Sequence, residues 1–390
     1  MKADRHEVVV IGGGIAGLWL LDSLVRAGFS AVVLNKGDLG QGQSIAAQGI
    51  IHGGVKFVGE TAVADLAPMP DLWRASLAGK SGPDLSMVKP LADNMHMWLP
   101  PQSVDSGLAM AVRNLARGTV RDCAIDERPS VLPPTAEGRL LEVDEVVIDV
   151  PQALAALQDR YRDRIFGLPD SGDVGLAARD DGGADITAGD MTIQAQRVVL
   201  TAGAGNETLL SQAGLNQIAC QRRPLHQVMV RGMGQPIFMH CIGMNPKPLA
   251  TITSYTDPEG GYFWYIGGLL AEQGVAQSPG QLIAKAKPEL ARLLPGADFS
   301  QAAWATHAVE RAEPGGYGGS RPGSAVAKAH GAVIVGWPTK LALAPVLAEK
   351  IMGILNGGHL KPGPHDLSAL SALPVPRVAR PPWEMVQTWI

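Results

Sequence analysis

Three glycines near the start of the chain have the spacing of a phosphate-binding turn. Gly12, Gly14 and Gly17 form a GxGxxG pattern. Glycine at these positions permits a tight turn, a close approach of the backbone to a pyrophosphate, and close packing of the following helix on the strand. The free N–H groups at the start of that helix would bind the phosphates, which adds Ile15 and Ala16 to the expected contacts. The pattern predicts a dinucleotide-binding site.

One histidine and three basic residues could hold and activate a small anion. His52 lies in a His-Gly-Gly turn, and an imidazole can accept a proton near neutral pH. Arg311, Arg321 and Lys56 could hold an anionic group through charge-assisted hydrogen bonds. A structural interpretation stays open for each of them. Arginines near glycine-rich turns often lie at the surface, and a histidine in such a turn can simply bond the backbone.

The residues around the glycines have the pattern of one strand-helix-strand unit. Residues 8–11 are a continuous apolar run, which is typical of a buried parallel strand. Apolar residues recur at helical spacing over 15–27, and 31–34 is a second apolar run. Asn35 and Lys36 stand where this fingerprint usually has an acidic residue. An asparagine can still bond a ribose hydroxyl, whereas the pair could also suit a 2′-phosphate, which would indicate a nicotinamide cofactor.

The rest of the chain predicts a divided nucleotide domain around a second, β-rich domain. The segments 197–200 and 332–335 resemble the first buried strand, and short β-rich runs fill 222–274. We therefore expect an α/β fold, in which a doubly wound Rossmann-like domain carries an inserted antiparallel β-rich substrate domain. The expected boundaries are 1–85, 141–215 and 325–365 for the nucleotide domain, 86–140 and 216–324 for the substrate domain, and 366–390 for a C-terminal tail.

Composition limits the class of protein. Of the 390 residues, 46% are hydrophobic, and 33 Lys and Arg stand against 37 Asp and Glu. This balance excludes disorder as the dominant state and predicts no nucleic-acid partner. Three scattered cysteines predict no disulfide framework, no structural zinc or other metal site, and a reducing compartment. Because the N-terminal apolar stretch is short and contains glycines, we expect a cytoplasmic protein with at most peripheral membrane contact.

Three separated stretches resemble the FAD-dependent oxidoreductases of the D-amino-acid oxidase superfamily. They are VVVIGGGIAGL at 8–18, VVLTAGAGN at 198–206 and VIVGWPTKLALAP at 333–345. The resemblance implies a glutathione-reductase-type FAD domain, noncovalent FAD, and Lys340 beside the flavin ring, where negative charge accumulates on reduction. The expected cofactor contacts are Gly12, Gly14, Ile15, Ala16, Gly17, Asn35, Lys36, Gln43, Ser44, Gln48, Gly49, Val174, Ala202, Gly203, Gly336, Thr339, Lys340 and Leu341.

Within this superfamily, the motifs are most similar to those of FAD-dependent glycerol-3-phosphate dehydrogenases and oxidases and of 2-hydroxyglutarate oxidases. The family's Leu-Ile-His-Gly-Gly-x-Arg-Tyr run resembles IIHGGVKF at 50–57. Its Gly-Val-Arg-Pro, Ser-Arg and Gly-Gly-Lys-Leu-Thr motifs resemble 309–312, 320–321 and 339–342. Lys56, Phe57 and Ala312 depart from the family pattern, and a lysine holds an anion only as a point charge. A carboxylate is therefore as plausible a ligand as a phosphate.

The resemblance implies an enzyme that oxidises a small anionic substrate by hydride transfer to FAD. The substrate would be a 2-hydroxy acid or a polyol phosphate, and the electrons would pass to O2, a quinone or a partner protein. His52 would be the base, and Lys56, Arg311, Arg321 and Lys340 would supply positive charge. Two alternatives stay open, an amine or amino-acid oxidase of the same superfamily and a flavin-holding subunit of a larger complex. The apolar end, 383–390, would dock on the protein or contact a membrane or partner.

Overall fold

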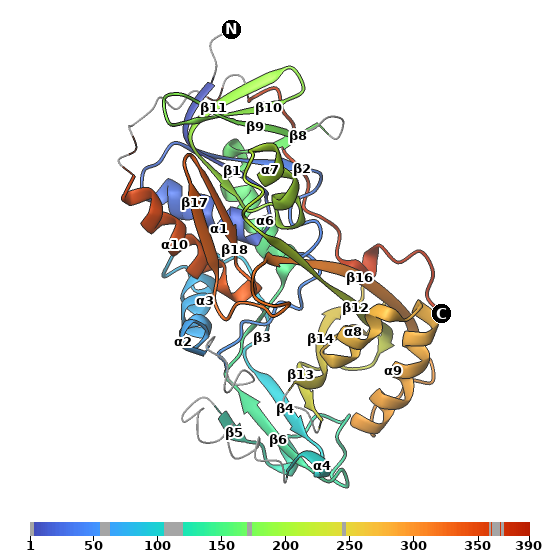
Figure 1. The fold of residues 1–390 in the computed structure, drawn as a ribbon. Helices are drawn as coiled ribbons and strands as arrows, with labels where there is room; N and C mark the ends of the chain where they lie inside the picture. Colours follow the sequence, from blue (N-terminus) through green and yellow to red (C-terminus); the bar gives the residue numbers. More distant parts are fainter. Residues whose placement is uncertain are drawn as a thin grey trace.

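The computed structural model describes residues 4–54, 63–104, 120–169, 174–243, 247–358, 360, 367 and 370–390, which form two large sheets (Figure 1). The first sheet has the order β17-β18-β11-β1-β2-β8, with β10 and β9 paired beyond β11. Its strands are β1 (Asp4–Ile11), β2 (Ala31–Lys36), β8 (Ile165–Leu168), β9 (Val174–Ala178), β10 (Ala184–Ala188), β11 (Met191–Leu200), β17 (Val326–His330) and β18 (Val333–Trp337). The four pairings among β18, β11, β1, β2 and β8 are all parallel.

The second sheet is mostly antiparallel and has the order β16-β12-β15-β14-β13-β4-β6-β5. Its strands are β4 (Met95–Leu99), β5 (Val120–Asp122), β6 (Arg139–Val143), β12 (Cys220–Met233), β13 (Met239–Ile242), β14 (Pro248–Thr256), β15 (Tyr262–Gly267) and β16 (Ala303–Pro314). A small third sheet pairs β3 (Pro90–Ala92) with β7 (Val147–Ile148). The expected α/β class with an antiparallel second sheet is confirmed.

Helices surround the first sheet and cover one side of the second (Figure 1). They are α1 (Ile15–Arg26), α2 (Val63–Leu66), α3 (Met69–Leu77), α4 (Pro101–Val104), α6 (Val150–Arg160), α7 (Asn206–Gln212), α8 (Leu269–Gln273), α9 (Pro279–Leu293) and α10 (Ala344–Asn356). The described part of the chain contains no helix that is both long and apolar enough to cross a membrane.

Alternation along β1 explains how the first sheet fills two hydrophobic cores. Val8 and Val10 face a core built with α1, α3, α6 and α10, whereas Val9 and Ile11 face a second core with β9, β10 and α7. A strand that is buried on both faces needs apolar residues at every position. This is why the run 8–11 contains no polar residue.

The aromatic run of β15 divides between two cores in the same way. Trp264 packs in the core that β12 and α9 form, whereas Phe263 and Tyr265 pack on the opposite face against the C-terminal segment. The Tyr255 and Trp383 ring centroids lie 3.9 Å apart. The tail therefore docks on the second sheet in the described structure, as its apolar composition predicts.

The same C-terminal segment also binds the first sheet. The carbonyl of Pro374 accepts a 2.7 Å hydrogen bond from the N–H of Gly167 in the edge strand β8, and the N–H of Ala379 donates to Leu39 in the loop after β2. At the chain end, Ile390 exchanges two backbone hydrogen bonds of 2.9 Å with Trp304. The segment therefore runs from the edge of one sheet to the edge of the other and connects them.

The domain boundary that the sequence predicts at 140/141 falls inside β6, and the other domain boundaries stay a prediction.

We expect Trp389→Ala to lower the free energy of unfolding by about 1–2 kcal/mol. Trp389 is half-buried, and its ring stacks on Phe263 with centroids 5.8 Å apart. Met385→Ala is the matched control, because Met385 lies in the same segment but is 47% exposed. Urea unfolding of both variants measures the difference. Equal midpoints for the two variants would contradict the docked position of the tail.

Candidate active site

A cavity of about 950 Å³ is lined by residues from the loops of the first sheet and by strands of the second. Fifteen of the residues expected from the sequence line this cavity. They are Gly14, Ile15, Ala16, Gln43, Ser44, Gln48, Gly49, His52, Gly203, Arg311, Arg321, Gly336, Thr339, Lys340 and Leu341. Segments that are more than 300 residues apart in the chain therefore meet at one place. Lys56 and Phe57 lie outside the described residues.

The glycine turn between β1 and α1 is shaped by close backbone packing. Gly12 has φ +113°, and a Cβ on it would lie 2.6 Å from the backbone of Ala202. A Cβ on Gly17 would collide with the carbonyl oxygen of Gly12, which also accepts a 2.9 Å hydrogen bond from the Thr201 hydroxyl. Gly12, Gly17 and Ala202 do not line the cavity but allow the turn to close. Gly14, Ile15 and Ala16, which follow in the turn and the start of α1, do line the cavity.

The start of α1 fits an anionic group. Gly14 is the N-cap and provides no side-chain cap, and the first turn contains no acidic residue. The N–H of Ile15 donates to the Ser44 hydroxyl at 3.1 Å, which brings the following loop beside the helix end. A helix N-terminus that opens into a cavity with its partial positive charge uncompensated favours a phosphate. The residues present therefore fit the diphosphate of a dinucleotide.

Asn35 holds the glycine turn and does not reach the cavity. Its Oδ1 accepts a 2.7 Å hydrogen bond from the N–H of Gly13, and its Nδ2 donates to Lys36 and to Gly37, the latter at 2.9 Å. Lys36 is exposed, and Val174 lies in β9 against the second core. Of the expected cofactor contacts, Asn35, Lys36 and Val174 are thus placed away from the cavity. Their contact with a cofactor stays a prediction.

The corner after β18 brings a strained residue and a buried lysine to the cavity. Among the described residues, Thr339 is the non-glycine residue with positive φ, at 61°. Its hydroxyl donates to the carbonyl of Ser324 at 3.2 Å, and Lys340 is 8% exposed. A non-glycine residue keeps such a backbone only where its surroundings hold it, and these residues often lie at functional sites. Both Thr339 and Lys340 line the cavity.

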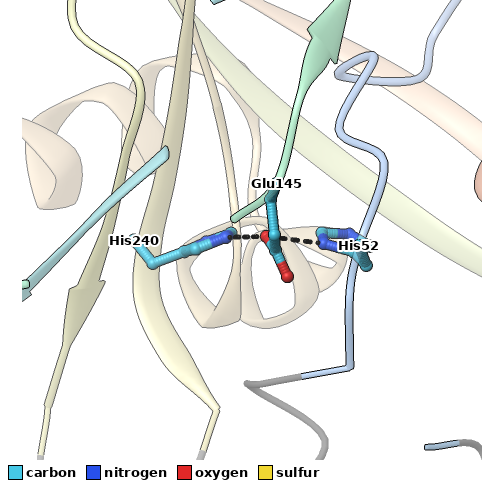
Figure 2. Close-up of side chains that lie close together, drawn as sticks. All are labelled: His52, Glu145 and His240. Atoms are coloured by element: carbon cyan, nitrogen blue, oxygen red, sulfur yellow. Dashed lines mark hydrogen bonds and ion pairs between the residues drawn. The ribbon is translucent and has the colours of Figure 1, made fainter. Parts of the chain in front are cut away.

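His52 belongs to a buried chain of hydrogen bonds (Figure 2). Its Nδ1 lies 3.1 Å from Oε2 of Glu145, and Nε2 of His240 lies 3.0 Å from the same oxygen. Nδ1 of His240 lies 3.0 Å from the Thr251 hydroxyl. Burial opposes ionisation of Glu145, but the two imidazoles outweigh it and hold the pKa of Glu145 well below its ordinary value. The carboxylate is therefore ionised.

The opposite wall of the cavity is strongly basic. Arg223 and Arg311 stand directly opposite each other on β12 and β16. Arg223 binds the buried carboxylate of Glu313 at 3.1 Å, whereas Nη1 of Arg311 lies 3.9 Å from Glu272. Burial and the charge of Arg223 lower the pKa of Arg311 to about 10. An anion bound beside Arg223 and Arg311 would relieve the repulsion between their two positive charges.

Sequence reasoning missed Glu145, His240, Arg223 and Glu272. The only sequence signal for Arg223 is that it lies at the start of the β-rich region 222–274, and its position opposite Arg311 becomes visible only when β12 is known to pair with β16. Glu145 and His240 lie 95 residues apart and belong to no local motif. The Arg223–Arg311 pairing and the Glu145–His240 contact both join residues that are far apart in the sequence.

The sequence and fold define this chain as a flavoprotein. Residues 7–344 match the model of the protein family described as "FAD dependent oxidoreductase", and the chain belongs to this family. It is 39% identical to the probable FAD-dependent oxidoreductase PA4991 of Pseudomonas aeruginosa PAO1 over 98% of this chain and 99% of that protein. The crystal structure of PA4991 superposes with a TM-score of 0.84 at 38% identity over 98% of this chain and 99% of that one.

More distant structures share the fold. Glycine oxidase from Geobacillus kaustophilus has a TM-score of 0.67 at 18% identity, covering 94% of this chain and 98% of that chain. L-α-glycerophosphate oxidase from Mycoplasma pneumoniae has a TM-score of 0.66 at 14% identity, and the match covers 90% of this chain and 95% of that chain. The expected FAD cofactor and the D-amino-acid oxidase superfamily are confirmed. The protein is an FAD-dependent oxidoreductase.

The cavity supplies what a flavin enzyme needs from its protein. A bound flavin supplies the hydride acceptor. Gly14 to Ala16 would hold the diphosphate, and Gly336 to Leu341 would lie along the other end of the cofactor. His52 lines the same cavity, and its side chain is 14% exposed.

Proposed function

We propose that the protein oxidises a small anionic substrate, a 2-hydroxy acid or a polyol phosphate, by hydride transfer to FAD. The observation that carries the proposal is the charge of the cavity wall. Of the described residues that line the cavity, five are cationic and one is a carboxylate, namely Arg223, Lys247, Arg311, Arg321, Lys340 and Glu272. Like charges placed opposite each other across a sheet are unfavourable, so Arg223 and Arg311 favour an anion between them.

The histidine supports hydroxyl chemistry. A carbon that carries OH gives up a hydride only as its hydroxyl proton leaves, and a general base accelerates that step. His52 can take this proton, whereas a neutral amine can use its own lone pair. Arg311 would meanwhile hold the anionic end of the substrate and orient its carbon toward the cofactor.

Glu272 favours the second candidate, oxidation of an amine or amino acid. Its carboxylate lines the cavity 3.9 Å from Arg311 and binds the ammonium of Lys247 at 2.9 Å. Lys247 and Arg311 lower the pKa of Glu272, although burial opposes this shift. A substrate that carries both an ammonium and a carboxylate would find a partner for each beside the same arginine.

Anaerobic bleaching of the flavin by matched substrate pairs tests the proposal. Each 2-hydroxy acid is compared with the 2-amino acid of the same carbon skeleton, and glycerol phosphate is included. We expect a hydroxy acid or the polyol phosphate to bleach the flavin, and we expect Arg311→Ala to weaken its apparent affinity about 10- to 100-fold. Arg292→Ala is the control, since Arg292 lies on the surface of α9 and is 51% exposed.

Two results would contradict this assignment. Bleaching by amino acids alone would favour the amine candidate. An unchanged apparent affinity in Arg311→Ala would remove the anion-binding role of that arginine. Co-purification of a second polypeptide, together with no bleaching by any small molecule, would instead favour a flavin-holding subunit.

A further inference from the structure

Glu145 and His240 form a buried group behind His52 that the reaction just described does not use. Glu145 is 1% exposed and His240 is 0% exposed. The nearest charged neighbour along the chain, Asp144, is paired separately with Arg74. A buried carboxylate is costly unless hydrogen bonds and charge compensate for it, so its presence here requires an explanation.

The hydrogen bonds fix which imidazole nitrogens carry protons. An ionised carboxylate can only accept hydrogen bonds, so Nδ1 of His52 and Nε2 of His240 must both be donors. Nδ1 of His240 is then the acceptor for the hydroxyl of Thr251. Each group in this chain has one consistent role. The proton of neutral His52 lies on Nδ1, which leaves Nε2 as its basic nitrogen.

We propose that Glu145 is the positioning residue for His52 and that His240 and Thr251 hold Glu145 in place. This inference rests on the proposed function, because it assigns a task to the base. When Nε2 of His52 takes the substrate proton, the imidazole becomes a cation, and the carboxylate already hydrogen-bonded to its other nitrogen stabilises that charge. No proton needs to pass to Glu145.

The same three side chains could in principle bind a metal ion, since their ligand atoms lie within 4.8 Å of one another. Figure 2 shows the two imidazoles on opposite sides of the carboxylate, with one oxygen accepting from both. A tetrahedral zinc would instead draw all three ligand atoms toward a common centre at about 2.0–2.2 Å. The arrangement favours the hydrogen-bonded chain, and zinc binding is an outcome that the test distinguishes.

Imidazole NMR of the FAD-loaded wild-type protein tests the proton positions without any substrate. With 15N-labelled histidine, and with signals assigned through His52→Asn and His240→Asn, we expect the Nδ1–H form for His52 and the Nε2–H form for His240. The Nε2–H form of His52 would overturn the proposal. So would stoichiometric zinc in the purified protein that is lost in Glu145→Gln. These readouts stay decisive even if no hydroxy acid bleaches the flavin.

Glu145→Gln tests the effect on the reaction while retaining the shape of the side chain. With the hydroxy acid that bleaches the wild-type flavin fastest, we expect flavin reduction to slow about 10- to 100-fold. Two titratable groups contact His52: the Glu145 carboxylate bonds its Nδ1, and the His240 ring centroid lies 5.9 Å from its own. Losing the negative charge lowers the pKa of the imidazole, so the rising limb of the pH profile should move to lower pH.

Asp257→Asn is the matched control. Asp257 is also a buried carboxylate, 4% exposed, in the turn after β14, and it pairs with Arg231 away from the cavity. We expect this variant to lower thermal stability and to leave the rate and the pH profile unchanged. If Glu145→Gln reduces its flavin at the wild-type rate with an unshifted profile, Glu145 has no positioning role.

Discussion

His52→Asn should slow anaerobic flavin reduction by a 2-hydroxy acid about 10²- to 10⁴-fold, the range that a general base contributes. Asparagine retains hydrogen-bonding capacity but cannot accept a proton near neutral pH. The change leaves the diphosphate site at Gly14 to Ala16 untouched, so the variant should purify with its full flavin content. Stopped-flow absorbance, using the hydroxy acid that bleaches the wild-type flavin fastest, measures the rate.

His226→Asn is the control for this substitution. His226 is a buried histidine of β12, and it bonds the Gly274 carbonyl and the Thr306 hydroxyl. Its loss should lower stability and leave the reduction rate within about twofold, because it is not connected to His52. If both variants reduce the flavin at the wild-type rate, the base is elsewhere, and the amine candidate gains support.

Gly17→Val should yield protein with little or no bound flavin and should lower the free energy of unfolding by about 3 kcal/mol. A Cβ at Gly17 meets the carbonyl oxygen of Gly12 and the Thr201 hydroxyl. Either the turn must open or α1 must move away from β1, and both movements displace the N–H groups that would hold the diphosphate. The ratio of flavin to protein absorbance, together with the unfolding midpoint, measures the two effects.

Gly353→Val provides the same substitution in a helix that has room for it. Gly353 is exposed on α10, and a Cβ there would meet no heavy atom within 4 Å. We expect normal flavin content and a stability that is unchanged or slightly higher, since valine has a better helix propensity than glycine. A Gly17→Val protein with the same flavin content and the same stability as this control would contradict the role assigned to the glycine turn.

The cofactor domain could be predicted because its signals are local. The apolar run at 8–11, the three glycines and the helix that follows lie within one short stretch, and buried parallel strands need apolar residues at every position. The sequence also predicted that Gly203 and Thr339 would reach the same site as Gly14. That inference depended on family resemblance, because no local pattern shows which loops of a sheet meet.

The substrate side of the cavity could be predicted only in part. His52 was a candidate base from its own sequence, but the carboxylate that orients it lies 93 residues away. Arg311 was expected to bind an anion, whereas its cross-strand neighbour Arg223 depends on the register of β12 and β16. Asn35 was expected at a ribose, which stays a prediction, and its side chain bonds the backbone of the glycine turn. Long-range pairing decides each of these positions.

A crystal structure of the FAD-loaded protein with a bound 2-oxo acid, the product of the proposed reaction, tests the account most directly. We predict that the acid lies between the two walls of the cavity, with its carboxylate on Arg311 and its oxo oxygen within hydrogen-bonding distance of Nε2 of His52. A flavin ring that separated the acid from His52, or a carboxylate bound at a site away from Arg311, would contradict the proposed roles of these two residues.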